Sequence, residues 1–202
     1  MERLLDRFRN AHTQPLGVSV DSKFCHAGWA QSLGGVSFPL LADFHPKGAL
    51  ARSVGLYLED AGITDRATVI IDASGVVRHA SSVSPSGERD IEELAALCEA
   101  VDREHGAGLE AVPRPQGLGG GATLYVKSAC GFSAWALQAR DNLHLADALA
   151  VKNVTEDPAA KKELQQACGK EQAPCLVAGD QVMLESADII KHMVDRCTDI
   201  PT

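Results

Sequence analysis

The chain has 202 residues, which is long enough for one large domain or two small ones. Its 27 acidic residues outnumber its 19 lysines and arginines, and a net charge of −8 argues against nucleic acid or an anionic membrane surface as the main partner. No apolar run approaches the roughly 20 residues of a membrane span, and the charged residues 1–7 lack the apolar core of a signal peptide.

The first half of the chain alternates short apolar runs with helical patterns. The strands that we expect are short and rich in β-branched residues: 16–20, 38–43, 67–71 and 76–80. The helices that we expect are 1–10, one that follows the capping pair Asp21–Ser22 and ends at Gly34–Gly35, one from Pro46 to Val54, and 86–103. This half is therefore predicted to form one domain over residues 1–103.

Residues 104–121 are rich in Gly and Pro and have no periodicity, which predicts an interdomain linker. After it the pattern repeats, with strands expected at 123–127, 149–154, 175–178 and 182–184. Helices are expected at 131–144, 157–168 and 186–196. This order is the thioredoxin arrangement, so the second domain spans 122–202 and the fold class is α/β with two thioredoxin-like domains.

The residue with the clearest chemistry is Cys130, which stands where a strand passes into a helix. Helix N–H groups and the helix dipole stabilise a thiolate there, and Lys127 adds positive charge, so we expect a nucleophilic thiol. Ser133 occupies the position that a second cysteine would take in a two-thiol enzyme, and we expect it to act as a cap or local donor. Because a hydroxyl cannot close a disulfide, Cys130 must exchange with an external thiol.

The other five cysteines show no C-x-x-C pair and no zinc-site spacing: Cys25, Cys98, Cys168, Cys175 and Cys197. We therefore expect reduced thiols in a cytoplasmic protein, with no metal site. Cys25 lies near a helix start, beside His26, and is either a resolving thiol or an incidental one. Cys98 is expected in the core, and Cys168, Cys175 and Cys197 are expected to be structural.

The segment from Lys127 to Ser133 resembles the active site of a glutaredoxin, and its CGFS tetrapeptide is that of the monothiol kind. Ala173-Pro174-Cys175 resembles the family's cis-proline segment, and Gly179-Asp180 resembles the turn after the following strand. Residues 185–188 resemble the segment that holds the γ-glutamyl end of glutathione. The resemblance covers roughly residues 122–198.

This resemblance implies a glutathione-dependent thiol–disulfide oxidoreductase with glutathione as co-substrate. It gives Cys130 the catalytic role and assigns glutathione binding to Lys127, Phe132, Pro174, Cys175, Ser186, Ala187 and Asp188. For Asp188, a carboxylate favoured by the helix dipole is an equal interpretation. An alternative is a module that holds an iron–sulfur cluster between two chains without catalytic turnover. Lys127 disfavours it, because CGFS glutaredoxins usually place this lysine further upstream of the cysteine.

The first half resembles a peroxiredoxin through Val18 to Ser22, Phe38 to Asp43, Ile63 to Asp72 and Gly75 to Arg78. Phe44 to Leu50 suggests the one-cysteine alkyl hydroperoxide reductases. Arg66 falls on the family's active-site arginine, which pairs with the peroxide and the thiolate. A homodimer or larger oligomer through this half is expected.

The family's essential Pro-x-x-x-Thr-x-x-Cys loop has no counterpart in the chain. The resemblance implies that this loop and the central strand would lie upstream of Met1, which makes the first domain incomplete at its N-terminus. Apolar positions such as Val18, Val69 and Ile71 should then be poorly covered. Together the two halves resemble fused, glutathione-fed peroxidases, which implies a role in peroxide detoxification and redox homeostasis, with glutathionylated or peroxide-oxidised thiols as partners.

Overall fold

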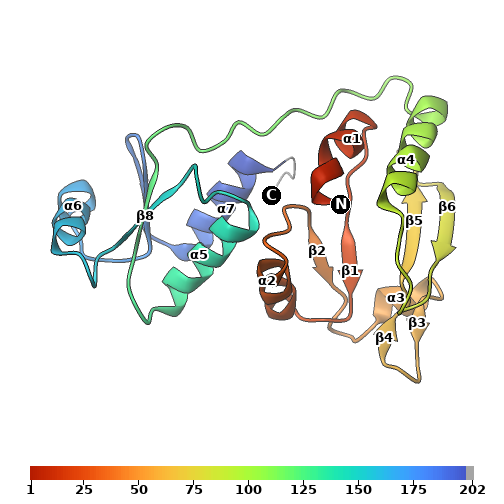
Figure 1. The fold of residues 1–202 in the computed structure, drawn as a ribbon, viewed down its shortest axis with the longest axis horizontal. Coiled ribbons are helices and arrows are strands. Elements are labelled where there is room, and N and C mark those ends of the chain that lie inside the picture. Colours follow the sequence, from red (N-terminus) through yellow and green to blue (C-terminus); the bar gives the residue numbers. More distant parts are fainter. Residues whose placement is uncertain (199–202) are drawn as a thin grey trace. The chain divides into compact units, whose positions relative to one another are not determined.

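The computed structural model describes residues 1–198, so the last four residues of the expected second domain, 199–202, lie outside it (Figure 1). The chain divides into two compact units. Unit 1 comprises residues 1–26 and 38–113, and unit 2 comprises residues 27–37 and the chain from residue 114 onward. Each unit is described by itself below.

Unit 2 is built on one four-stranded sheet. Its strands are β7 (Thr123–Val126), β8 (Ala150–Asn153), β9 (Cys175–Ala178) and β10 (Gln181–Met183), in the spatial order β10-β9-β7-β8. β8 is parallel to β7, whereas β9 is antiparallel to both β7 and β10. This is the thioredoxin-like arrangement expected from the sequence, with β7 paired on both sides.

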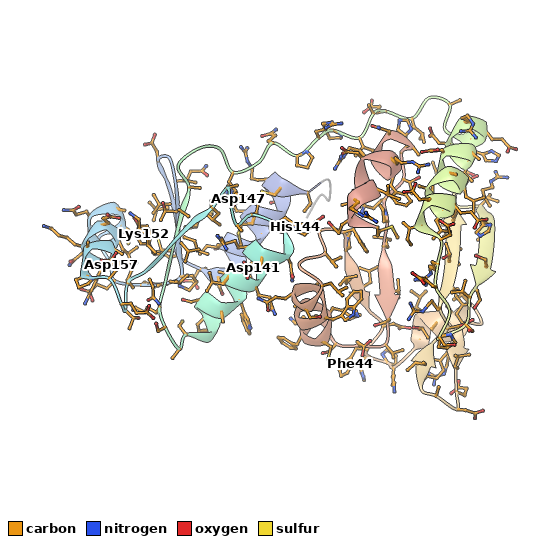
Figure 2. The ribbon with its side chains drawn as sticks, viewed as in Figure 1. Phe44, Asp141, His144, Asp147, Lys152 and Asp157 are labelled. Atoms are coloured by element: carbon orange, nitrogen blue, oxygen red, sulfur yellow. The ribbon has the colours of Figure 1, made fainter. Side chains whose placement is uncertain are left out.

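Three helices cover the two faces of this sheet: α5 (Gly131–Asn142), α6 (Pro158–Cys168) and α7 (Ser186–Cys197). Figure 1 shows α6 on one side of the sheet and α5 with α7 on the other. Side chains alternate along β7, so Leu124 and Val126 pack in the core with α5 and α7, while Tyr125 packs in the core with α6. Asp157, labelled in Figure 2, caps α6 by accepting a hydrogen bond from the Ala159 N–H at 2.8 Å.

The core of unit 1 lies between its first and last helices, α1 (Leu5–Asn10, preceded by the 3-10 turn Glu2–Leu4) and α4 (Ile91–His105). Phe8 packs there with Ile70, Ala95 and Cys98. The Arg7 guanidinium adds ion pairs across the two helices, to Glu99 at 2.7 Å and to Glu92 at 2.5 Å.

The strands of unit 1 form three separate pairs rather than one sheet. β1 (Gly17–Ser19) pairs in parallel with β2 (Leu40–Ala42), and β5 (Ala67–Ile71) pairs antiparallel with β6 (Val77–Ser82). Two two-residue strands, β3 (Tyr57–Leu58) and β4 (Ile63–Thr64), form the third pair. Val18, Val69 and Ile71 are 41%, 43% and 59% exposed, which confirms that these apolar positions are poorly covered.

Two helices of this half differ from their expected bounds because of local capping. The last helix begins at Ile91 rather than near residue 86, since the Asp90 carboxylate accepts from the Glu93 N–H at 3.0 Å. α3 (Ala49–Ser53) begins after Gly48, whose φ of 69° belongs to the left-handed region. α2 (Lys23–Ser32) begins as expected after Ser22, whose Oγ accepts from the Cys25 N–H at 3.3 Å.

The segment expected as a linker, residues 104–121, packs against unit 2 near its end, at Gly117 and Leu118. Leu118 is buried in the core that α5 and α7 share, and the Gly117 N–H donates to the Arg196 carbonyl at 2.8 Å. Arg196 returns a hydrogen bond from Nε to the Gly117 carbonyl at 3.0 Å. Within residues 1–198, no helix is both long and apolar enough to cross a membrane.

Candidate active site

Cys130 is the N-cap residue of α5, at the end of the loop that leaves the central strand β7. The preceding residue, Ala129, has a φ of 53°, in the left-handed region that side chains other than glycine rarely adopt. The turn at Ala129 brings the chain from β7 into α5 within a few residues. The half-buried Cys130 thiol therefore lies at the positive end of a helix, as the sequence predicts.

Several hydrogen bonds stabilise the thiolate form of Cys130. The Ser133 hydroxyl is the largest cause of a lowered Cys130 pKa, followed by the backbone N–H of Ser133 and then that of Phe132. The positive charge of Lys127 adds to this lowering, whereas burial opposes it. Cys130 is thus more acidic than an ordinary cysteine, which favours nucleophilic attack at neutral pH.

Ser133 has a second contact that fixes its hydroxyl. Its side chain is 1% exposed, and its Oγ accepts a hydrogen bond from the Lys127 N–H at 3.1 Å. The same oxygen can then donate its proton to the Cys130 sulfur. The lowered pKa of Cys130 agrees with the expectation that Ser133 is a local donor, and burial restricts the orientation of its hydroxyl.

A polar network ties the Cys130 loop to the end of β8. The Ser128 N–H donates to Thr155 Oγ1 at 3.2 Å, and the Ser128 hydroxyl donates to Glu156 Oε1 at 2.5 Å. Asn153 Nδ2 donates to Ser128 Oγ at 2.8 Å and to Glu156 Oε1 at 2.9 Å. These contacts tie the loop to the last residue of β8 and to the turn after it, and sequence reasoning missed them.

Cys130 opens onto a pocket of about 360 Å³. Its walls are mostly apolar and come from the end of β7, the Cys130 loop, α5 and β8: Val126, Lys127, Ser128, Ala129, Cys130, Gly131, Ala134, Leu137 and Asn153. Of the residues predicted for the site, the pocket brings together Cys130 and Lys127.

Pro174 is buried and follows a cis peptide bond at Ala173–Pro174, as expected. In the register of β7 with β9, Tyr125 is opposite Cys175, so Pro174 directly precedes the first paired residue of β9. The Cys175 side chain is fully buried, and burial raises its pKa to about 12. Only the backbone of Cys175 is therefore suited to touch a ligand.

The other predicted glutathione residues lie on two helix starts. Ser186, Ala187 and Asp188 form the first turn of α7, with Ser186 buried and the other two exposed. The free N–H groups of such a turn favour an anion. Phe132 is 60% exposed on the first turn of α5, where its ring meets that of Trp135 edge to face at 5.7 Å.

Arg66, the predicted peroxide-site residue of unit 1, is exposed at the start of β5. Its Nε donates to the Pro85 carbonyl at 3.1 Å, and its charge helps to lower the pKa of Arg89, for which burial is the larger cause. Arg89 Nη2 donates to the Ala67 carbonyl at 2.7 Å, while its buried Nε has no hydrogen-bond partner among residues 1–198. Sequence reasoning missed Arg89, because nothing in its local pattern marks it.

Cys25 is exposed on α2, whereas its neighbour His26 is buried. His26 Nε2 lies 2.7 Å from Ser19 Oγ, which donates to Asp21 Oδ2 at 2.7 Å. The Cys25 N–H donates to Ser22 Oγ at 3.3 Å. A resolving role for Cys25 remains a prediction.

Comparison with known proteins agrees with this division of the chain. Residues 1–80 match the AhpC/TSA family, and residues 122–183 match the glutaredoxin family. Alkyl hydroperoxide reductase E of Mycobacterium tuberculosis is 39% identical over 97 residues, which are 46% of this chain and 63% of that protein. Peroxiredoxin-4 of Bos taurus is 34% identical over 102 residues, which are 48% of this chain and 36% of that protein.

Among solved structures, Mycobacterium tuberculosis AhpC is 31% identical with a TM-score of 0.46, over 50% of this chain and 59% of that one. The chain spans less than two thirds of the length of these relatives. Both matched families are oxidoreductases, which indicates a redox and antioxidant function. The chain therefore joins a partial peroxiredoxin domain of the AhpC/TSA family to a glutaredoxin domain.

Proposed function

We propose that this protein is a glutathione-dependent thiol–disulfide oxidoreductase of the monothiol glutaredoxin kind. The observation that carries the proposal is the Cys130 thiol at the start of α5, whose pKa is lowered first by the Ser133 hydroxyl and then by backbone N–H groups. A thiolate formed at neutral pH is what attack on a disulfide requires. With Ser133 in place of a second thiol, the resolving thiol comes from glutathione.

The predicted glutathione residues fit the chemistry of the tripeptide. We assign one glutathione carboxylate to the ammonium group of Lys127 and the γ-glutamyl end to the first turn of α7, where Ser186, Ala187 and Asp188 offer backbone N–H groups and a carboxylate. The backbone of Cys175, after Pro174, is suited to pair with the extended tripeptide. The exposed Phe132 ring covers apolar parts of the ligand.

The reaction proceeds in two exchanges. The Cys130 thiolate attacks the glutathionyl sulfur of a mixed disulfide, the old S–S bond breaks, and the substrate thiolate leaves and takes up a proton. A second glutathione thiolate then attacks the same glutathionyl sulfur, releases oxidised glutathione and restores the Cys130 thiolate. Hydrogen bonds from Ser133 and the helix N–H groups stabilise Cys130 as the leaving group in this step.

We further propose that the attached peroxiredoxin domain is the source of oxidised thiols, which places the protein in peroxide detoxification and redox homeostasis. A Gly- and Pro-rich connection keeps such a substrate at high effective concentration. All six cysteines are free, which is in keeping with a reducing, cytoplasmic location. The exposed apolar residues of unit 1, such as Ile71, favour a homodimer or larger oligomer through this half.

The test is glutathione-dependent reduction of a small glutathione mixed disulfide by the full chain and two cysteine variants. Cys130→Ser should abolish the activity, because a hydroxyl does not ionise at neutral pH. Cys25→Ser, which changes an exposed thiol that also lies near a helix start, should retain it. An equal loss in both variants would remove Cys130 from its proposed role.

The CGFS tetrapeptide favours one competing function, an iron–sulfur cluster held between two chains by Cys130 and glutathione. An absorption spectrum of protein purified without oxygen separates the two functions. A colourless protein with turnover supports the oxidoreductase. A coloured protein that loses its colour in the Cys130→Ser variant and lacks turnover supports the cluster module.

A further inference from the structure

The pocket beside Cys130 lies on one flank of the nucleophile, whereas most of the residues predicted to bind glutathione do not line it. Asn153 of β8 lines the pocket and is opposite Val126 of β7 in the parallel register. Cys175, the first residue of β9, pairs with β7 along its other edge. Of the residues predicted to bind glutathione, all of which lie in the described part of the chain, only Lys127 contributes to the pocket wall. The pocket is therefore a second space at the reacting sulfur.

One face of α5 forms a wall of this pocket. The Ala134 N–H donates to the Cys130 carbonyl at 2.9 Å, so Ala134 lies one helical turn beyond the nucleophile, and Leu137 follows three residues later. Residues at this spacing share one face of a helix. Ala134 is exposed and Leu137 is half-buried, so both side chains have surface to offer to a ligand. This wall of the pocket is apolar.

The polar side chains of the pocket are already hydrogen-bonded within the protein. Asn153 Nδ2 donates to Ser128 Oγ at 2.8 Å and to Glu156 Oε1 at 2.9 Å, which uses both of its hydrogens. Asn153 Oδ1 accepts from the Thr155 N–H at 3.0 Å, and the Ser128 hydroxyl donates to the same Glu156 oxygen. Because these groups are largely satisfied, the pocket favours an apolar group over one that needs new hydrogen bonds.

We propose that this pocket binds the apolar group on the sulfur that Cys130 attacks, so that the protein reduces disulfides of apolar thiols directly as well as glutathione mixed disulfides. The pocket volume of about 360 Å³ is at the lower end of the range for small-molecule sites, which suits a group about the size of a benzyl group. The proposal rests on the proposed function for its turnover and adds a second substrate class. It makes Ala134 and Leu137 specificity-determining residues.

The reaction begins when the Cys130 thiolate attacks one sulfur of a disulfide R–S–S–R, in which R is the apolar group. The S–S bond breaks, one R–S⁻ leaves and takes up a proton, and the other R stays in the pocket, bonded through its sulfur to Cys130. A glutathione thiolate then attacks the sulfur that carries R, which releases the Cys130 thiolate and forms a mixed disulfide of R and glutathione. That product enters the two exchanges already proposed. In total, one R–S–S–R and two glutathiones give two R–SH and one oxidised glutathione.

The pocket is tested first without turnover, by two reagents that differ only in the group R. Methyl and benzyl methanethiosulfonate both transfer R–S to a thiolate and release methanesulfinate. After the free thiols are alkylated, trypsin cleaves after Lys127 and Arg140, and the resulting peptide of residues 128–140 contains Cys130 and no other cysteine. Mass spectrometry of this peptide gives the ratio of the benzyl rate to the methyl rate at Cys130. We expect a ratio about tenfold higher than that of free glutathione, the lower end of the discrimination that apolar pockets reach.

Two alanine-to-leucine variants make this measurement specific to the pocket. Ala134→Leu fills the pocket from α5 and should lower the ratio about tenfold, to that of free glutathione. Ala167→Leu makes the same change on an exposed position of α6, on the other side of the sheet, and should keep the native ratio. Alanine and leucine are both strong helix formers, so both helices should persist. An equal fall in the two variants, or a native ratio equal to that of free glutathione, overturns the pocket.

Turnover is then measured with the disulfide of 2-phenylethanethiol, glutathione and glutathione reductase, after subtraction of the reaction without protein. We expect kcat/KM for this disulfide to be about tenfold lower in Ala134→Leu than in the native chain and in Ala167→Leu. A rise of the glutathione KM in Ala134→Leu places glutathione itself in the pocket and overturns the proposal.

The two measurements separate the pocket from the proposed function. If the native chain shows the benzyl preference but reduces neither this disulfide nor a glutathione mixed disulfide, the proposed function fails and the pocket remains a binding site. If it reduces glutathione mixed disulfides without any benzyl preference, the pocket fails and the proposed function remains.

Discussion

The two units differ in how their central strands are paired, and we expect their chemistry to differ accordingly. In unit 2, β7 pairs with a strand on each side, and its side chains pack into the cores on both faces of the sheet. The loop after β7 places Cys130 at the start of α5. In unit 1, β1 and β5 belong to separate strand pairs, and Val18 and Val69 stay exposed. In unit 2 the strand β7 therefore both completes the sheet and positions the nucleophile.

The largest difference between the domains should be in their reactions. The 202-residue chain should consume hydrogen peroxide at least about a hundredfold more slowly than it reduces a glutathione mixed disulfide. A factor of about a hundred is the rate effect of one positioned electrostatic group in an active site. The reason is that, among residues 1–198, the Arg66 side chain hydrogen-bonds to the Pro85 carbonyl rather than to a thiol. The two rates can be compared in one preparation, with glutathione and its reductase present.

Peroxide consumption by the Cys25→Ser variant tests the role of Cys25 in this comparison. If the chain consumes peroxide rapidly and Cys25→Ser removes that activity, Cys25 is the peroxidatic residue and its assignment as a resolving or incidental thiol is wrong. If the slow rate is the same in Cys25→Ser, Cys25 is not the peroxidatic residue.

The next largest effect is on stability. Leu176→Ala in β9 removes a fully buried side chain and should cost about 2–5 kcal/mol of unfolding free energy. Val69→Ala in β5 changes a side chain that is 43% exposed and should cost well under that, on the order of 0.5 kcal/mol. Hydrogen exchange of peptides from each unit measures the two costs separately. Equal losses would mean that Val69 is covered in solution, for example by a second copy of the chain.

The sequence was sufficient to predict the features that depend on local pattern. The β-branched run at 67–71 became β5, the apolar run at 175–178 became β9, and the strand-to-helix junction placed Cys130 at a helix start. These succeed because period and turn chemistry are encoded in neighbouring residues. The cis bond before Pro174 was predicted in a different way, through the resemblance to glutaredoxins.

The features that were missed depend on residues distant in sequence. The strands β3 and β4 are two residues each, too short to show a period. Arg89 Nη2 reaches the Ala67 carbonyl only because the chain returns along β6. Ser133 was expected as a local donor, but its hydrogen bond from the Lys127 N–H needed the structure.

A smaller effect should follow from removing the Ser133 hydroxyl. Ser133→Ala should raise the pKa of Cys130 toward that of an ordinary thiol, because the largest cause of its lowering is lost. A lowered pKa means that the thiolate is present at pH values above that pKa, so the rise of alkylation rate with pH should move to higher pH. At alkaline pH the rates of native chain and variant should converge.

Ser128→Ala is the matched control for this measurement. Ser128 lies in the same loop and hydrogen-bonds Glu156 and Asn153, but it does not contribute to the Cys130 pKa. Its alkylation profile should stay near that of the native chain. If both variants shift equally, the loop conformation rather than the Ser133 hydroxyl sets the acidity of Cys130.

The smallest expected effect concerns the hairpin of unit 1, which has no further strand beside it in the described sheets. The Asp72 carboxylate holds the turn between β5 and β6, accepting from the Ser74 hydroxyl at 2.6 Å, from the Ser74 and Val76 N–H groups at 2.9 and 3.0 Å, and from Arg78 at 2.6 Å. These contacts, with the Ser74 hydroxyl first, hold the pKa of Asp72 far below its usual range. Because the folded pKa is depressed, the stabilisation is complete above the ordinary aspartate pKa of about 3.9 and is lost as pH falls through the lower folded value.

Asp72→Asn should therefore reduce hydrogen-exchange protection of β5 and β6 at neutral pH and make it less sensitive to acid. The β9–β10 hairpin of unit 2, supported by β7, should be unaffected in the same spectra, and a uniform loss across both hairpins would contradict a local role for Asp72.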